Sequence, residues 1–250
     1  MRALLCLAAV AGLSACGGAG LKLPETSDDK AVGSVTVTRG KVTLTGPTGF
    51  CVDPENANQT PESAFVVFGN CAAITGTSNA SRPPVNAIVT TTVRMADPSV
   101  PKIDQSAQQL ASFFDSNAGH ILLSRDNTSE SVSVNESGAT EDGAFFLHIT
   151  DASAGIPQGA SNTYWRSYFD IKNTLVTVSV LSLNTTPLTR DEGLDLLRTF
   201  TSMVQQNPGN VTAKRPVAAA TIQTPASSGD TQIKPIIRPD GEIADEVSST

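Results

Sequence analysis

Between residues 34 and 93, apolar and polar side chains alternate with a period of two, which predicts β-strands. Two of these runs flank Arg39-Gly40, a pattern typical of a hairpin. A third run begins at Phe50 and is expected to stop at Pro54, because proline cannot donate to a sheet ladder. The expected strands in this part of the chain are 35–38, 41–44, 50–52, 64–68 and 87–93.

The period then changes to about 3.6, which predicts a helix over Asp104–Ser116. We expect Asp104 to cap its start and Gly119 to end it. A short strand is expected at Ile121–Leu123 and another at Ser131–Glu136. The apolar face of the helix predicted over Asp104–Ser116 carries Ala107, Leu110, Ala111 and Phe114.

Three longer strands are expected at 144–150, 163–171 and 174–183, the last two joined at Lys172-Asn173 as an antiparallel hairpin. Thr189 and Glu192 then form the pattern of a capping box, which predicts the start of a second helix. Its apolar stripe is Leu194, Leu197, Phe200 and Val204.

These elements predict one α+β domain over residues 34–206, with a mainly antiparallel, twisted sheet and two helices packed on it. Residues 16–33 show no apolar period and are expected to form a flexible linker. Residues 207–250 are rich in proline and small residues and are expected to be disordered. Within them, Ile233–Ile237 is either a docking peptide or an apolar cluster that arose by chance.

The order of elements over about residues 41–206 resembles that of the PsbP-like α/β/α sandwich family. The resemblance rests on Gly49–Pro54 near the start and on the strand at 174–183 that leads into the helix at 189–205. It implies the fold and a non-catalytic binding or assembly role, which most members of that family have. No functional residue is carried over, and the pair Cys51 and Cys71 is an addition to the family's pattern.

The first sixteen residues predict where the protein is found. Arg2 precedes the uncharged run Leu4–Leu13, which has the length of a signal-peptide core and is too short to span a bilayer. Leu13-Ser14-Ala15-Cys16 resembles the bacterial lipobox, which implies a signal peptide over residues 1–15 and lipid attachment at Cys16. The alternative is an ordinary secretory signal in which Cys16 is incidental.

On the lipobox reading, acyl chains (palmitate among them) anchor the chain in the membrane through its N-terminus, with the domain facing the periplasm. Gly17 follows the lipidated residue where an aspartate would favour the inner membrane, so the outer membrane is favoured. The formal charge of −7 and the lack of a basic run argue against a nucleic-acid partner.

Two cysteines remain in the folded part, and an exported chain with one such pair most simply forms a disulfide between Cys51 and Cys71. A redox-active pair is the alternative, but Cys-X-X-Cys spacing is absent and neither residue opens an obvious helix.

Few residues suggest catalysis or metal binding. His120, expected to open a strand, and His148, within a strand, are the only histidines, and we expect both to be hydrogen-bonded or on the surface. No nucleophile elbow, phosphate loop or zinc motif is present. Asp126–Glu136 is acidic but lacks the alternating ligands of a calcium loop, so a solvated loop is favoured. No catalytic residue, metal site or cofactor is therefore predicted.

The densest aromatic cluster lies in the strand at 163–171. Alternation places Tyr164, Arg166 and Tyr168 on one face and Trp165, Ser167 and Phe169 on the other. Either one face is core and the other is covered by a helix, or Tyr164, Arg166 and Tyr168 form an exposed interaction patch.

We therefore expect a non-enzymatic, lipid-anchored cell-envelope protein of a Gram-negative-type bacterium, with a role in binding or assembling an envelope partner. The alternatives are a periplasmic domain that binds a small ligand or a metal ion, and a hydrolase that uses carboxylates, since such catalysis leaves little trace in residue spacing.

Overall fold

The structure is a computed structural model that describes residues 32–38, 41–155 and 159–211. Seven antiparallel strands form one sheet in the order β3-β4-β5-β9-β8-β7-β6, and β1 and β2 form a separate hairpin. The strands are β1 (Ser34–Val37), β2 (Val42–Thr45), β3 (Phe50–Gln59), β4 (Ser63–Asn70), β5 (Ala87–Met95), β6 (Val132–Ala139), β7 (Phe145–Asp151), β8 (Ala160–Ile171) and β9 (Thr174–Leu183). The helices are α1 (Cys71–Thr75), the 3-10 turn η1 (Ile103–Gln105), α2 (Ala107–Phe114), α3 (Asn117–Leu123) and α4 (Arg190–Gln205).

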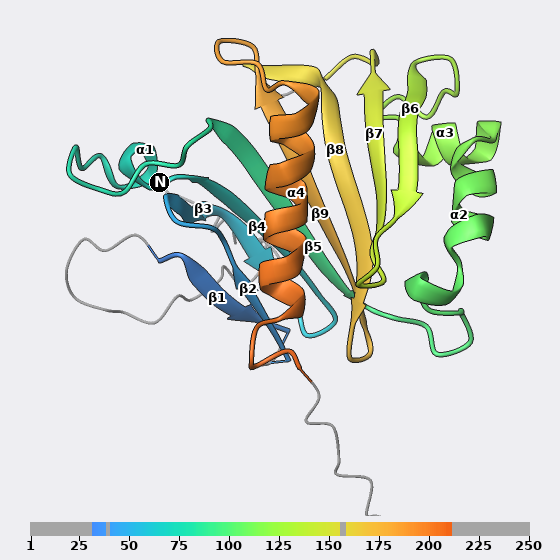
Figure 1. The fold of residues 1–250 in the computed structure, drawn as a ribbon, viewed down its shortest axis with the longest axis horizontal. Helices are drawn as coiled ribbons and strands as arrows, with labels where there is room; N and C mark the ends of the chain where they lie inside the picture. The colour runs from blue at the N-terminus through green and yellow to red at the C-terminus, as the bar shows by residue number, and fades with distance from the viewer. Residues whose placement is uncertain (1–31, 39–40, 156–158, 212–250) are drawn as a thin grey trace, which may run out of the picture. The chain divides into compact units, whose positions relative to one another are not determined.

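The fold is α+β, with helices on both faces of the antiparallel sheet, as the sequence predicts. Figure 1 shows α4 crossing one face beside the β1–β2 hairpin, while α2 and α3 lie at the β6 end of the sheet. The hairpin at residues 34–45 and the β8–β9 hairpin around Lys172 are confirmed.

Helix α4 and the hairpin cover the larger core. The ring of Phe200 meets those of Phe50 and Phe68 edge to face, with centroids 5.3 and 5.4 Å apart. The predicted capping box starts this helix: the Thr189 amide donates to Glu192 Oε2 (2.8 Å), and the Glu192 amide donates to Thr189 Oγ1 (3.3 Å). Two otherwise unpaired helix-end donors are satisfied in this way.

A buried asparagine beyond α4 fixes the hairpin in place. The Asn210 side chain accepts from the Thr43 amide (2.7 Å) and donates to the carbonyls of Thr43 and Val204 (2.7 Å each). Because these bonds join residues far apart in the chain, they hold β2 to the end of α4.

The opposite face is covered over β6–β8 by α2 and α3, where the structure corrects three predictions. Ile121–Leu123 is the last part of α3, not a strand, and Gly119 lies inside that helix instead of ending the preceding one. A Cβ at Gly119 would lie 2.2 Å from the Phe113 carbonyl oxygen, so glycine permits the close approach of α3 to the end of α2. Asp104 lies in η1 and does not cap α2, whose N-cap is Ser106.

The strand predicted to stop at Pro54 continues to Gln59. β3 is an edge strand that pairs only with β4, and Pro54 has no partner in that ladder, so its missing N–H removes no bond between the two strands. The register shifts between Asp53 and Asn58, where polar residues form an irregular part of the strand.

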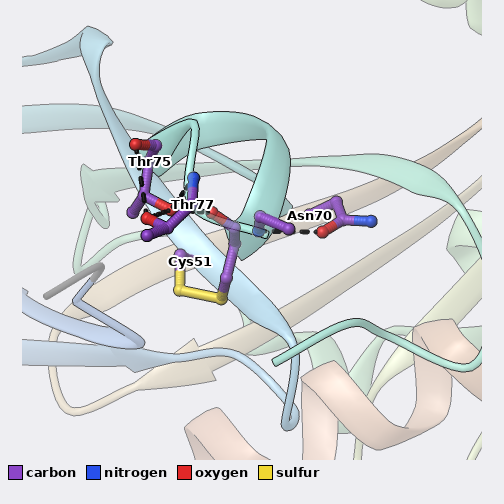
Figure 2. The surroundings of a disulfide bond; sticks show 6 residues. Cys51, Asn70, Thr75 and Thr77 are labelled. Atoms are coloured by element: carbon purple, nitrogen blue, oxygen red, sulfur yellow. Dashed lines mark hydrogen bonds between the residues drawn. A yellow bond between two sulfur atoms is a disulfide. The ribbon is translucent and has the colours of Figure 1, made fainter. Parts of the chain in front are cut away.

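Cys51 and Cys71 form the predicted disulfide, with their Cα atoms 4.9 Å apart (Figure 2). It joins the start of β3 to α1, a short helix that the sequence did not reveal and that Cys71 opens. Asn70 caps this helix by accepting from the Ala72 amide (3.0 Å).

Candidate functional site

The three residues of the predicted aromatic patch, Tyr164, Arg166 and Tyr168, share one face of β8, as strand alternation predicts. That face is turned toward α2 and α3. Tyr164 is buried, and its hydroxyl donates to the Leu123 carbonyl (3.5 Å). The ring of Tyr168 stacks on Phe114 at 5.5 Å. The two tyrosines therefore pack beneath helices, which is the covered alternative rather than the exposed patch.

Beside these tyrosines, the same face of the sheet is not covered by a helix of the described structure, and we call this part the open face. Among the described elements, α2 and α3 reach β6–β8 and do not extend over β4 and β5 (Figure 1). The open face is therefore made by alternate residues of β4, β5 and β9, most of them half-buried. They are Phe65, Val67, Ile88, Thr90, Thr92, Leu175, Thr177, Ser179 and Leu181.

Arg166 borders this open face. Its Nε donates to Ser179 Oγ (2.9 Å), and its Cζ lies 5.0 Å from the centroid of the Tyr164 ring. Burial lowers the pKa of Arg166, but Tyr168 and Tyr164 outweigh that effect and raise the pKa above its ordinary value. The guanidinium is therefore charged at any physiological pH.

A groove of about 800 Å³ lies at one end of the open face, between the loop after β5 and the β8–β9 turn. Met95 and Val100 stand on it with 42% and 62% of their surface exposed. Arg94 and Lys102 also line it, are exposed, and make no ion pair among the described residues. The groove thus combines apolar side chains with two unpaired cations.

The acidic residues of the groove are occupied by local hydrogen bonds. Asp97 accepts from the amide and hydroxyl of Ser99 (2.8 and 2.7 Å), which lowers the pKa of Asp97. Asp170 accepts from the Ile103 amide (2.7 Å) and so fixes the loop that forms one wall. Neither carboxylate forms an ion pair with Arg94 or Lys102.

A second hollow, of about 530 Å³, lies at the opposite end of the open face, beside α1. Asp53, Asn70, Ile74 and Ile88 are among the residues that line it. The Asp53 carboxylate is held by the Glu55 amide (3.0 Å) and the Asn56 side-chain amide (2.7 Å), so it is part of the turn in β3.

The two histidines lie apart. His148 is in β7 on the α4 side, stacked on Trp165, while His120 lies in α3 and not at the start of a strand. Burial lowers the pKa of His148; Glu136 raises it and Arg190 lowers it further. Arg190 itself forms a bidentate pair with Glu136, with Nη2 2.7 Å from Oε1. No nucleophile is hydrogen-bonded to either imidazole within the described part of the chain.

The acidic segment that begins at Asp126 is a hydrogen-bonded turn. The Asp126 carboxylate accepts from the hydroxyls of Ser124, Thr128 and Ser131, which lowers its pKa well below the usual range. Across residues 32–38, 41–155 and 159–211, no group of three or more His, Cys, Asp or Glu side chains is placed to hold a metal ion.

An ion pair with a buried carboxylate lies at the end of β7. Asp151 is fully buried, and its Oδ2 lies 3.2 Å from Arg125 Nη1 without forming a hydrogen bond of good geometry. Its Oδ1 accepts from the amide of Ser153 (2.9 Å) and from the hydroxyl of the same residue. The Arg125 Nη2 also donates to the Asp151 carbonyl (2.9 Å), so a partly exposed arginine holds a buried carboxylate.

Cys16 and the segment Ile233–Ile237 lie outside the described residues. Over the residues that are described, no helix has the length and hydropathy needed to cross a bilayer.

No known protein-family model matches the sequence, and no relative is found among curated proteins. The structure is similar to that of cyanobacterial PsbP (CyanoP) from Synechocystis sp. PCC 6803, with 13% identity and a TM-score of 0.38, covering 77% of this chain and 95% of that one. It is also similar to the Saccharomyces cerevisiae Ran-binding protein Mog1p, with 14% identity and a TM-score of 0.34, covering 69% of this chain and 89% of that one. With sequence identities of 13% and 14% and TM-scores of 0.38 and 0.34, these similarities support no conclusion about function. The fold class rests on the sheet and helices described above.

The groove was not predicted from the sequence. Its loop carries Pro98, Val100 and Pro101 between a strand and a helix, which is ordinary for a connection. Only the tertiary structure shows that the apolar side chain of Val100 is turned outward beside two cations.

Proposed function

We propose that the protein is a non-enzymatic, lipid-anchored cell-envelope protein that binds a protein partner through the groove at the end of the open sheet face. The observation that carries this proposal is the pairing of exposed Met95 and Val100 with the unpaired cations Arg94 and Lys102. Exposed apolar side chains beside polar ones are typical of protein interaction sites.

The partner is a protein segment that presents apolar and acidic side chains. Charge complementarity supports this choice, because the chain has a formal charge of −7 and yet brings Arg94, Lys102 and Lys172 together on this groove. Lys172 is already bound to the carbonyls of Lys41 and Gly209 (2.9 and 2.7 Å), so Arg94 and Lys102 are the cations available to the partner.

The lipobox-like sequence Leu13–Cys16 supports the membrane anchor, and Gly17 supports the outer membrane. Several acyl chains hold a protein on a bilayer stably, whereas one chain holds it only marginally. The folded domain is then attached to the outer membrane and faces the periplasm, where its groove meets another envelope protein.

Site-specific crosslinking in intact envelopes tests the partner. A photoreactive phenylalanine analogue replaces Val100, and the matched control carries it at Thr199, an exposed position on α4. We expect a defined adduct from position 100 only, and expect it to disappear in the double variant Arg94→Glu and Lys102→Glu. Adducts of equal yield from both positions, or adducts that survive the charge reversal, would contradict the proposal.

The anchor is tested separately by membrane fractionation and mass spectrometry. We expect the wild-type protein in the outer-membrane fraction, with acyl groups on an N-terminal Cys16, and the Cys16→Ala variant in the soluble fraction. An unmodified wild-type residue 16, or a variant that stays with the membrane, would overturn the anchor and leave the groove proposal standing.

A further inference from the structure

The open face carries charges of opposite sign at its two ends. The groove at one end holds the unpaired cations Arg94 and Lys102, and the hollow beside α1 at the other end is lined by Asp53 and Glu55. Asp53 accepts two local hydrogen bonds, but neither carboxylate forms an ion pair among the described residues. One surface therefore presents both halves of an ion pair without joining them.

Strand pairing gives the separation of these charges. Asp53 pairs with Val67, which pairs with Thr90, so Asp53 lies two strands from Thr90, about 10 Å at the usual strand spacing. Arg94 lies four residues beyond Thr90 on β5, about 13 Å along the strand. The backbone positions of Asp53 and Arg94 are therefore about 16 Å apart, roughly twice the distance over which salt screens exposed charges at physiological ionic strength.

The surface between the two ends is apolar. No charged residue occurs in β4, in β9, or in β5 before Arg94. Contiguous uncharged surface that no described helix covers is typical of a protein interaction site. The large apolar side chains on it are half-buried, and they are Phe65, Val67, Ile88, Leu175 and Leu181.

We infer that the partner of the groove is a second copy of this chain, packed on the open face around a two-fold axis. This inference rests on the proposed function, because it names the protein that the groove binds. A two-fold axis that lies in the interface, midway between two patches on one face, exchanges those patches between the copies. The groove of each copy then faces the hollow of the other, and the two cations of one copy meet the two carboxylates of the other.

Charge complementarity favours a second copy over an unrelated protein. In a two-fold interface every contact is made twice, so a second copy neutralises the groove and the hollow of both molecules at once. An acidic segment of another protein would neutralise Arg94 and Lys102 but leave Asp53 and Glu55 unpaired. The formal charge of −7 repels a second copy at long range, so the association depends on these local pairs.

The area of the open face sets the expected strength of the dimer. Four strands at about 4.8 Å and seven residues at about 3.3 Å give the sheet part an outline of roughly 400 Å². With the groove and the hollow at its ends, the contact falls in the lower part of the range for specific interfaces, which is about 800 Å² per partner. We expect a dissociation constant on the order of 10 µM in solution, and more dimer on a membrane, where anchoring raises the effective concentration.

Crosslinking between two tagged copies tests the inference in intact envelopes. Two copies of the full chain with different epitope tags are produced together, each with a photoreactive phenylalanine analogue at position 100. We expect an adduct that contains both tags and has twice the mass of the chain. Arg94→Glu with Lys102→Glu in both copies should abolish this adduct, and so should Asp53→Asn with Glu55→Lys in both copies. Asp53→Asn keeps an oxygen acceptor for the turn in β3.

The decisive measurement combines the two variants. One copy carries Arg94→Glu and Lys102→Glu and is acidic at both ends, and the other carries Asp53→Asn and Glu55→Lys and is basic at both ends. We expect this pair to recover the adduct, at a yield at least tenfold above that of either variant alone. Recovery also shows that both variants fold. Arg198→Glu reverses an exposed charge on α4, away from the open face, and should leave the wild-type adduct unchanged.

Sedimentation of the purified wild-type chain in detergent provides a measurement that needs no variant. We expect a reversible dimer, and a monomer at about 100 µM would overturn the inference. An adduct at position 100 with a different protein, and none with a second copy, would overturn it and leave the proposed function standing. The absence of any adduct would overturn both. An adduct with both tags that survives either charge reversal would show that the copies meet through another surface, and would also overturn the inference.

Discussion

The imidazole of His148 lies parallel to the indole of Trp165, with ring centroids 4.2 Å apart and an angle of 9° between the planes. This stack lies on the α4 side of the sheet, near the ion pair of Glu136 and Arg190. Burial lowers the pKa of His148, Glu136 raises it and Arg190 lowers it again, with a net decrease. The neutral imidazole is therefore the form that the fold favours.

We predict that protonation of His148 destabilises the fold. The unfolded state binds a proton near pH 6.5 and the folded state only at lower pH, so the free energy of unfolding falls as the pH decreases through about 6.5. His148→Gln should flatten this dependence between about pH 7.5 and 5.5. Urea unfolding at several pH values measures it, with His120→Gln as the control for loss of an imidazole. Equal slopes for the wild type and His148→Gln would contradict the prediction.

Reduction of the Cys51–Cys71 disulfide should lower the free energy of unfolding by about 3 kcal/mol, because the bond closes a loop over a sequence separation of 20. The measurement is urea unfolding with and without a thiol reductant. In the double variant Cys51→Ser and Cys71→Ser the reductant should have no effect, which controls for its action elsewhere. Identical stabilities of the oxidised and reduced wild type would rule out this contribution.

Gly193→Ala should destabilise the protein, although alanine is favoured over glycine in a helix by about 1 kcal/mol. A Cβ at this position would lie 2.5 Å from Cδ1 and 2.6 Å from Nε1 of Trp165, a buried ring that cannot move aside easily. Overpacking of this kind costs about 1–3 kcal/mol. Thermal unfolding measures the result, with Thr199→Ala on the exposed side of α4 as the control. A melting temperature above that of the wild type would show that α4 can shift away from the sheet.

Arg125→Met should cost about 2–3 kcal/mol, because it leaves the fully buried Asp151 carboxylate without its cation. The expected loss in the free energy of unfolding is below the usual cost of breaking a buried ion pair, because the Arg125 side chain is 29% exposed and water already weakens its interaction with Asp151. Adding Asp151→Asn to this variant should recover part of the loss. Denaturant unfolding of the two single variants and the double variant gives the coupling energy. Additive losses would mean that the two side chains do not interact.

Several elements were predictable because their signals are local. Thr189 and Glu192 form both halves of a capping box in the sequence, and the structure confirms both hydrogen bonds. The turn at Lys172 separates two strands whose alternation is long and regular, so the β8–β9 pairing was also predicted. Each of these signals involves residues within a few positions of one another.

Other elements depend on distant parts of the chain. Pro54 is tolerated inside β3 because that strand is at the edge, and an edge position is a property of the whole sheet. Ile121–Leu123 is helical because Gly119 allows α3 to meet α2, a contact that an apolar triplet does not reveal. The faces of β8 were predicted, but the cover over Tyr164 depends on where α2 and α3 pack.

The two hydrogen bonds between Asn210 and Thr43 span a sequence separation of 167. A ribosome releases the hairpin long before it releases this asparagine, so the growing chain carries β1 and β2 without these hydrogen bonds until residue 210 has emerged. A stop codon placed before residue 210 would therefore remove the hydrogen bonds that hold β2 to the end of α4, even though every residue of the seven-stranded sheet had already been made.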